Sequence, residues 1–406
     1  MSADALYREM GLHGYPVEDS WEVKDVGLFV LVSVPRESLR CRSCGCGRVH
    51  VHEWRSRFWK AAPLGLTAVH VTMETPRVKC LQCESRTWHQ PTFVEGQRQI
   101  TKQFERCLES WLSRLTIQDA VEMFGVSWNT VCEIDIRRLK KLSRPGLPGL
   151  KRLAIDEVYL GRRHKFVTLV LDLETRAVVS IAPGRGQTGL QGFFLRLKRA
   201  GAKIKAVATD MAGGYIAAVL KYLPKARLVF DHFHVIRLMN EKLTILRRDL
   251  HRELTGSMHR EVLKGIRWLL LKNPENLAKT ERVEERKRLE DALKLNRPLA
   301  IAYYLKEDLR QFWSQKSALA AERFLDDWCR RAEASGIRVL QTMSKTLRTH
   351  RQGMLNWYVE PISSGPIEGI NNKIGALQRR AYGYRNYEHL KQRILTLHHA
   401  KFTIRG

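Results

Sequence analysis

The sequence predicts a multidomain α/β chain in which a long helical segment interrupts a core of alternating strands and helices. Three observations carry this prediction. Two C-x-x-C pairs lie in the first 95 residues, a Pro/Gly-rich break spans 144–149, and the following alternation of strands and helices gives way to helical pattern over 233–350. A chain of 406 residues is also longer than a single core, which stops growing near about 250–300 residues. We expect domains at 1–95, 96–149, 150–235, 236–360 and 361–406, the last completing the core that 150–235 begins.

The first module contains four paired cysteines. Cys41 and Cys44 form one C-x-x-C pair, and Cys80 and Cys83 form the other. Each pair can present two thiolates on a tight turn, and two pairs complete the closed tetrahedral shell of a structural Zn²⁺ site. The sequence therefore predicts a zinc ribbon with a small sheet, including strands at 28–34 and 69–73. Unliganded thiols are the alternative, and the possible substitute ligands are Cys46, His50, His52 and His89.

The second module has the form of a helix-turn-helix. Thr116 can cap a helix that runs to Phe124, Gly125 can form the turn, and Ser127 can cap a second helix. A recognition helix directs its N-terminal residues toward base edges, and basic residues follow further along this one. A plain helical hairpin is the alternative. The predicted DNA contacts of this helix are Trp128, Asn129, Thr130, Arg137, Arg138, Lys140 and Lys141.

The third segment reads β-β-β-α-β-α-β, the element order of a ribonuclease H-like fold. Asp156 lies inside the first apolar strand, and Asp210 ends the fourth. In open sheets of this kind, sites form where strand ends meet. We therefore expect the two strands that carry Asp156 and Asp210 to be neighbours. The expected strands are 151–160, 166–173, 177–182, 204–211 and 226–231, with helices at 189–200 and 213–223, and Asp172 is expected to be a turn residue.

A third carboxylate is needed to hold two metal ions, and Glu368 is the candidate. It follows Ser363-Ser-Gly-Pro, a good helix start, and Asn371 and Asn372 fall on the same face of that helix. A structureless loop of about 130 residues before it would be unusual, so the intervening sequence predicts an inserted helical domain. The tryptophans of that domain at helical positions, Trp268, Trp313 and Trp328, are expected to lie in its core.

Carboxylates are the ligands that Mg²⁺ and Mn²⁺ prefer. Two such ions about 3.5–4 Å apart can activate a water or a 3′-hydroxyl and stabilise the leaving oxygen. Asp156, Asp210 and Glu368 are therefore the predicted catalytic residues and metal ligands of a phosphodiester-cleaving site. The same site can join strands without a covalent protein–DNA intermediate.

The motifs around these residues resemble the DDE transposases of bacterial insertion sequences, specifically the zinc-ribbon type called the IS-L-three group. The resemblance covers nearly the whole chain and includes Gly365-Pro-Ile-Glu368-Gly-x-Asn-Asn-Lys373. Asp231-x-x-His234 resembles a motif that such cores carry after the fifth strand. We expect Asp231 and His234 to lie beside the site, where they could bind DNA or adjust metal affinity; the alternative is that they only pin the insertion to the core. The resemblance implies a transposase that binds terminal inverted repeats, cuts the element ends and joins them to target DNA.

The net charge of +28 favours a polyanionic partner. Residues 40–60, 136–165 and 369–406 make up less than a quarter of the chain but contribute +20 of this charge. The last of these stretches adds Lys373, Arg379 and Arg380 to the predicted DNA contacts. We expect double-stranded DNA as partner and, because two ends are joined, a homodimer or higher assembly. Without a secretory signal or an apolar run of the roughly 18 residues that a membrane span needs, we expect a cytoplasmic, nucleoid-associated bacterial protein.

Two other functions are compatible with parts of this pattern. A domesticated or inactive transposase would act as a sequence-specific DNA-binding regulator and would not need the acidic trio. A structure-selective nuclease of the same fold, such as a junction resolvase, would need the trio but not the N-terminal DNA-reading modules. The presence of both features favours the transposase.

Overall fold

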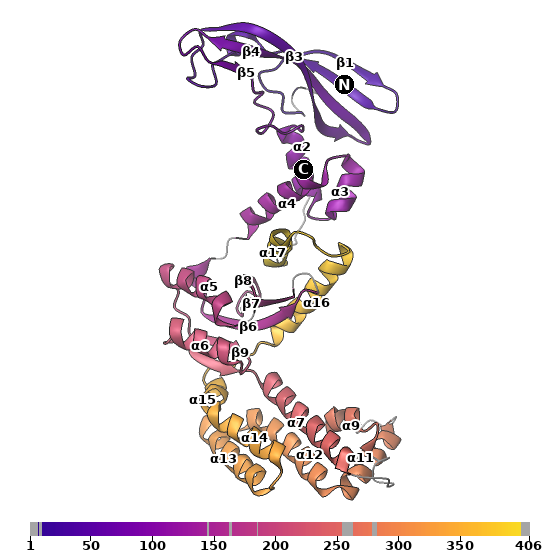
Figure 1. The fold of residues 1–406 in the computed structure, drawn as a ribbon, viewed down its shortest axis with the longest axis vertical. Helices are drawn as coiled ribbons and strands as arrows, with labels where there is room; N and C mark the ends of the chain where they lie inside the picture. The colour runs from indigo at the N-terminus through magenta and orange to yellow at the C-terminus, as the bar shows by residue number, and fades with distance from the viewer. Residues whose placement is uncertain are drawn as a thin grey trace. The chain divides into compact units, whose positions relative to one another are not determined.

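The computed structural model describes residues 7, 10–143, 146–161, 165–184, 186–253, 263–277 and 282–398. The chain forms two compact units (Figure 1). Unit 1 comprises Met1–Ser143, Arg379–Gln392 and His399–Gly406, and unit 2 comprises Arg144–Gln378 and Arg393–His398. The first boundary between the units falls where the Pro/Gly-rich break begins.

Unit 1 begins with a sheet built on a long hairpin. Its strands follow the order β1-β2-β4-β3, with β5 paired to β4; β2 and β4 are parallel and the other pairs antiparallel. Alternate residues of β4, such as Val69, Val71 and Met73, are buried, as expected for a sheet with one face on a core. The strands are β1 Val17–Val23, β2 Gly27–Val32, β3 Val49–Leu64, β4 Thr67–Cys80 and β5 Arg86–Trp88, and a short 3₁₀ helix, η1, spans Arg36–Ser38.

Three helices follow this sheet within unit 1: α2 Lys102–Trp111, α3 Ile117–Phe124 and α4 Trp128–Leu142. The predicted helix signals are confirmed. Thr116 caps α3 in a capping box with Asp119, and Ser127 accepts a hydrogen bond from the N–H of Thr130 at the start of α4. Gly125 ends α3 with φ of +59°, a left-handed conformation that glycine adopts without strain.

The C-terminal segment Arg379–Gln392 also belongs to unit 1. It contains most of α17, Tyr387–Leu395. The imidazole Nε2 of His389 lies 2.6 Å from the carboxylate of Asp135 on α4, and both side chains are buried. Ser143 donates a hydrogen bond to Gln392 nearby. Residues 361–406 therefore divide between the two units, although the sequence indicated that they all return to the catalytic core.

Unit 2 contains a second sheet, with strand order β10-β9-β6-β7-β8. β7 is antiparallel to both of its neighbours, while β6, β9 and β10 are parallel. All five predicted strands and both predicted helices of this segment are present. The elements are η2 Leu147–Gly149, β6 Arg152–Tyr159, β7 Phe166–Asp172, β8 Val178–Pro183, α5 Gln187–Arg199, β9 Ala206–Thr209, α6 Gly213–Tyr222 and β10 Arg227–Phe230.

The two faces of this sheet differ. Leu153 and Ile155 of β6 pack with Phe193 of α5 and Tyr215 of α6 in one hydrophobic cluster. Because successive side chains of a strand point to opposite faces, Asp156 points away from that cluster. Helix α16, Gly365–Arg380, buries Ile367, Ile370 and Ile374, and its Gln378 donates to the carbonyl of Leu160, just after β6.

A helical region joins β10 to α16. Its core includes Trp328, but Trp268 is 65% exposed, so the expectation of a core position is wrong for Trp268. Gly353 packs so closely on Phe230 of β10 that a Cβ there would lie 2.3 Å from the ring. None of the helices in the described ranges is long and apolar enough for a membrane span. The helices are α7 His232–Glu253, α9 Arg267–Leu271, α10 Pro274–Leu277, α11 Val283–Leu295, α12 Arg297–Arg310, α13 Ala318–Ala334, α14 Arg338–Thr349 and α15 Arg351–Leu355, with 3₁₀ segments η4 Gln311–Ser314 and η5 Asn356–Tyr358.

Candidate functional site

Asp156 lies in β6, and Asp210 directly follows the adjacent parallel strand β9. Ala154 of β6 pairs with Ala208 of the parallel strand β9, and each aspartate is two residues beyond its alanine. Side chains two residues apart share a face, and adjacent strands lie about 4.8 Å apart. The expectation that the two strands are neighbours is confirmed by this pairing.

The surroundings of Asp156 disfavour an isolated negative charge. Its side chain is 22% exposed, and burial raises its pKa. The backbone N–H of Glu157 and the imidazole of His234, 3.9 Å away, partly offset this effect, and the charge of Asp210 adds to it. Asp210 is oriented by the N–H of Ala212, which donates to its carboxylate. A cation between the two carboxylates would relieve their repulsion.

Glu368 lies exposed in the first turn of α16, as the sequence predicts. Asn372 is exposed one turn further along, and the buried Oδ1 of Asn371 has no hydrogen-bond partner in the described part of the structure. Across the described ranges, one group of three or more metal-ligand side chains has all its ligand atoms within 4.8 Å, and it consists of cysteines. The three carboxylates therefore do not converge that tightly.

Asp231 and His234 lie at the junction of β10 and α7. Asp231 is 1% exposed, and its carboxylate accepts hydrogen bonds from Ser364, immediately before α16. His234, on the first turn of α7, lies beside Asp156. Asp231 is therefore bonded to the residue before α16, whereas His234 lies next to Asp156 itself.

The cluster of metal-ligand side chains consists of Cys41, Cys44, Cys80 and Cys83. The Sγ atoms of Cys41 and Cys83 are 3.6 Å apart, as are those of Cys44 and Cys80. Pairing of β3 with β4 brings the two C-x-x-C turns together, because Val49, just after the first turn, pairs with Cys80. Four thiols so arranged have the chemistry and number of a tetrahedral zinc site.

Local backbone geometry shapes both cysteine turns. The residue after each pair, Gly45 or Glu84, has a positive φ. A hydrogen bond from the Ser85 hydroxyl is the largest influence on the pKa of Cys41, which is lowered to about 6. For Cys44, a backbone hydrogen bond at Cys46 lowers the pKa, but the neighbouring thiols and burial outweigh it and raise the pKa to about 12. The other candidate ligands, Cys46, His50, His52 and His89, are not part of the cluster.

The N-terminus of α4 presents the residues predicted to face DNA bases. Trp128 and Asn129 are exposed, and Thr130 is partly exposed with its hydroxyl 2.8 Å from that of Ser127. These three side chains are therefore accessible to a binding partner.

The basic residues further along α4 are engaged within unit 1. Arg137 pairs with the buried carboxylate of Glu105 on α2 at 2.5 Å. Arg138 is 14% exposed and bonds to Asp135 and to the carbonyl of Leu112. Lys140 and Lys141, by contrast, are more than half exposed, at 56% and 64%, and make only loose ion pairs, with Glu388 and Glu109.

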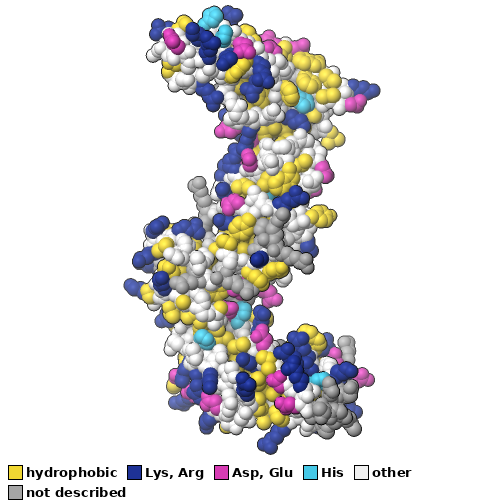
Figure 2. All heavy atoms as spheres, viewed as in Figure 1, with side chains coloured by type: hydrophobic (Ala, Val, Ile, Leu, Met, Phe, Trp, Pro, Cys, Tyr) yellow, Lys and Arg dark blue, Asp and Glu magenta, His cyan; other side chains and the backbone are white. Residues whose placement is uncertain are grey.

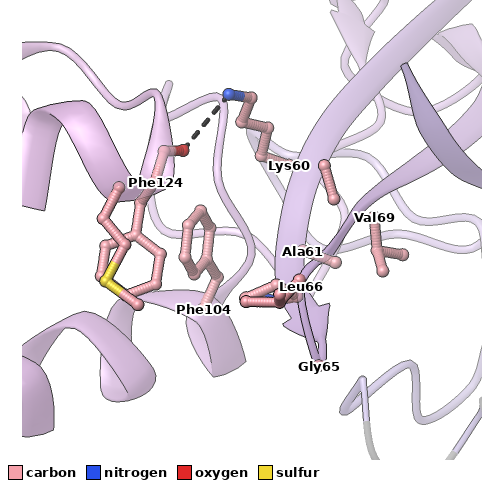
Figure 3. A pocket seen from close by; sticks show the side chains of 10 residues that line it. Lys60, Ala61, Gly65, Leu66, Val69, Phe104 and Phe124 are labelled. Carbon is pink, nitrogen blue, oxygen red and sulfur yellow. Dashed lines mark hydrogen bonds between the residues drawn. The ribbon is translucent and has the colours of Figure 1, made fainter. Parts of the chain in front are cut away.

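Lys60 is a residue whose role the sequence did not indicate. It reaches from β3 to the end of α3, where its ammonium group donates to the carbonyls of Phe124 and Gly125 (Figure 3). An apolar pocket beside it is lined by residues including Leu66, Phe104 and Met123. Cations favour helix C-termini, so Lys60 ties the sheet to the turn of the helix-turn-helix. In the sequence, Lys60 is simply a lysine among strand residues, and nothing there distinguishes it from a lysine exposed to solvent.

Comparison with known proteins identifies the relatives of this chain. Residues 153–394 match the DDE transposase family of ISL3 type, described as "Transposase". The transposase of insertion sequence element IS1001 from Bordetella parapertussis is 31% identical over 385 residues, covering 93% of this chain and 94% of that protein. The transposase of IS1557 from Mycobacterium tuberculosis is 30% identical over 403 residues, covering 89% and 86%.

Among solved structures, the Drosophila P element transposase strand transfer complex aligns with 76% of this chain and 93% of that one, at 12% identity and a TM-score of 0.37. The family match covers more than half of the chain, and the IS1001 relative spans nearly all of it. The chain therefore belongs to the ISL3-type family of DDE transposases and is a DNA transposase.

Proposed function

We propose that this transposase cuts and joins DNA at a site formed by Asp156, Asp210 and Glu368 on a ribonuclease H-like core. The strand order β8-β7-β6-β9-β10, with the second strand antiparallel, supports that core, since it is the 3-2-1-4-5 order expected of the fold. The observation that carries the proposal is the pairing of Ala154 in β6 with Ala208 in β9, because Asp156 and Asp210 each follow two residues after these alanines.

The donor set fits hard divalent cations. Two carboxylates on one sheet edge, one of them with a raised pKa, favour a bound cation, and Glu368 and Asn372 add oxygen ligands from α16. Bound Mg²⁺ or Mn²⁺ would activate an attacking oxygen and stabilise the leaving 3′-oxygen. The protein's part is to hold three carboxylates against their mutual repulsion and to orient the DNA backbone among them.

Unit 1 would recognise the inverted repeats of the element ends. The exposed Trp128, Asn129 and Thr130 suit a recognition helix whose N-terminus reads base edges. Phosphate contacts would come from exposed cations, and Lys and Arg side chains are spread over both units in Figure 2. We assign these contacts to Lys140, Lys141, Lys373 and Arg379. Arg137, Arg138 and Arg380 are left out, because their guanidinium groups bind residues of unit 1.

The four cysteines would hold one Zn²⁺ with a structural role. A closed shell of four thiolates leaves no open position for substrate, so the ion would only fix the two turns, one before the start of β3 and one at the end of β4. Joining two element ends in one reaction further favours a homodimer or a higher assembly on DNA.

A supercoiled donor plasmid carrying the element ends tests this function. With purified protein and Mg²⁺, we expect end cleavage followed by insertion into a target plasmid, because the same site can use water and then the freed 3′-hydroxyl as nucleophile. Products would be detected by gel electrophoresis and by sequencing of the junctions. A plasmid with scrambled ends is the control. Cleavage of branched DNA without any joining would instead support a structure-selective nuclease.

A further inference from the structure

A single buried carboxylate connects the start and the end of the helical insertion. Asp231 follows β10 directly, and its Oδ1 accepts from the N–H of Phe233 at 3.0 Å and lies 3.2 Å from Nδ1 of His232. Its Oδ2 accepts from both the N–H and the hydroxyl of Ser364, at 2.7 and 2.6 Å. Asp231 and Ser364 are 133 positions apart, so no local chain geometry brings them together.

These bonds place one negative charge at two helix N-termini. α7 begins at His232, and α16 begins at Gly365, immediately after Ser364. Helix N-termini stabilise anions. Burial opposes ionisation of Asp231, but hydrogen bonds from His232, Ser364 and Phe233 outweigh it and hold the pKa of Asp231 well below its usual range. The carboxylate is therefore charged at neutral pH and has donors for both oxygens.

Besides this bond, α16 is held by apolar packing on one face and by a hydrogen bond near its other end. Ile367, Ile370 and Ile374 bury one face of the helix, but apolar contact is non-directional and does not define how far the helix slides along its axis. Gln378 binds the carbonyl of Leu160 near the other end. Glu368 lies one turn from Ser364, within reach of any shift at that end.

We propose that Asp231 is a positioning residue, whose bonds to Ser364 hold the first turn of α16 where Glu368 can act with Asp156 and Asp210. This inference rests on the proposed function of those three carboxylates. A whole helical region separates Glu368 from the strands in the sequence, so chain connectivity alone does not hold Glu368 near them. In this proposal, Asp231 does so through its bonds to Ser364. Asp231 itself touches neither metal nor DNA in this assignment.

Asp231→Asn is the sharpest variant. Asparagine has the same shape, but one oxygen becomes an amide donor, and in either orientation that donor faces an N–H of Ser364 or of Phe233. Ser364→Ala is a milder second variant that removes only the hydroxyl bond. Asp172→Asn is the matched control: Asp172 is also buried, also ends a strand of this sheet, and accepts from the N–H and hydroxyl of Thr175.

The experiment measures four properties of each full-length variant: melting temperature, binding of an end oligonucleotide, joining of a pre-cut end, and Mn²⁺ affinity by electron paramagnetic resonance. Residues that orient metal ligands typically contribute about 10–100-fold in metal affinity or activity. We expect Asp231→Asn to lose joining and Mn²⁺ affinity by a factor in that range, with end binding retained. Ser364→Ala should lose less of both, and Asp172→Asn should change stability alone.

Equal losses in Asp231→Asn and Asp172→Asn at equal melting temperature would overturn the inference, as would unchanged Mn²⁺ affinity in both Asp231→Asn and Ser364→Ala. If Asp231→Asn does not fold, Ser364→Ala alone decides the outcome. Failure of the underlying function is recognised separately, since Glu368→Gln would then join ends as well as the wild type. An active wild type and an inactive Glu368→Gln, together with a fully active Asp231→Asn, would reject the positioning role only.

Discussion

Asp156→Asn, Asp210→Asn and Glu368→Gln are each expected to abolish strand transfer while leaving end binding intact. Each amide keeps the size of the side chain but removes the charge that holds a divalent cation, and metal ions contribute several kcal/mol of transition-state stabilisation. At about 1.4 kcal/mol per tenfold, the rate of joining should fall by roughly 10³-fold or more. Joining of a labelled pre-cut end and a gel-shift assay measure the two properties in parallel.

The matched control for these variants is Glu174→Gln. Glu174 is exposed at the turn after β7 and pairs with Arg152, so the substitution removes one carboxylate from the same unit without touching the proposed site. This variant should join ends at the wild-type rate. Loss of end binding in all three acidic variants would instead mean that the carboxylates have a structural role.

Cys80→Ser is expected to release zinc and to unfold the end of the β3–β4 hairpin. A serine hydroxyl is a poor zinc ligand, and structural zinc contributes an apparent 10–16 kcal/mol in zinc-finger peptides, about as much as the whole stability of a typical domain. We expect zinc content to fall from one ion per chain to near none, and the melting temperature of unit 1 to drop by roughly 10 °C or more. Metal analysis and calorimetry measure these changes.

Cys46→Ser is the control for Cys80→Ser, because Cys46 lies next to the four-cysteine cluster in the sequence but outside it. The sulfur of Cys46 accepts a hydrogen bond from the N–H of Arg48 and is not one of the four clustered thiols. This variant should therefore keep its zinc. Full zinc content in purified Cys80→Ser would refute the four-cysteine site.

Local signals explain what could be predicted from the sequence. The caps at Thr116 and Ser127 and the glycine turn between them are defined within a few residues, and the helices form as those residues indicate. The strands of unit 2 follow from short apolar runs, and the pairing of β6 with β9 follows from their order. Asp156 and Asp210 were predicted as site residues because sites in open sheets form where strand ends meet, and the element order makes their two strands neighbours.

Long-range partners explain what could not be predicted. The bond between Asp231 and Ser364 and the pair of Asp135 with His389 join residues far apart in the chain, and no spacing rule points to them. Arg138 was predicted to contact DNA because its charge is visible in the sequence, but its guanidinium group also donates to the carbonyl of Leu112, 26 residues away in the chain. Trp268 lies in helical sequence like Trp328, but only packing decides which of the two is buried.

The stereochemistry at phosphorus tests most directly the central claim that one acidic site joins DNA by direct displacement. A target strand carrying a phosphorothioate of known configuration at the insertion point would be joined to a pre-cut end by the wild-type protein. A single in-line attack of the 3′-hydroxyl, aided by the carboxylate site, inverts the configuration at phosphorus. We predict inversion in the joined product. Retention would require two displacements through a covalent protein–DNA intermediate and would contradict the account.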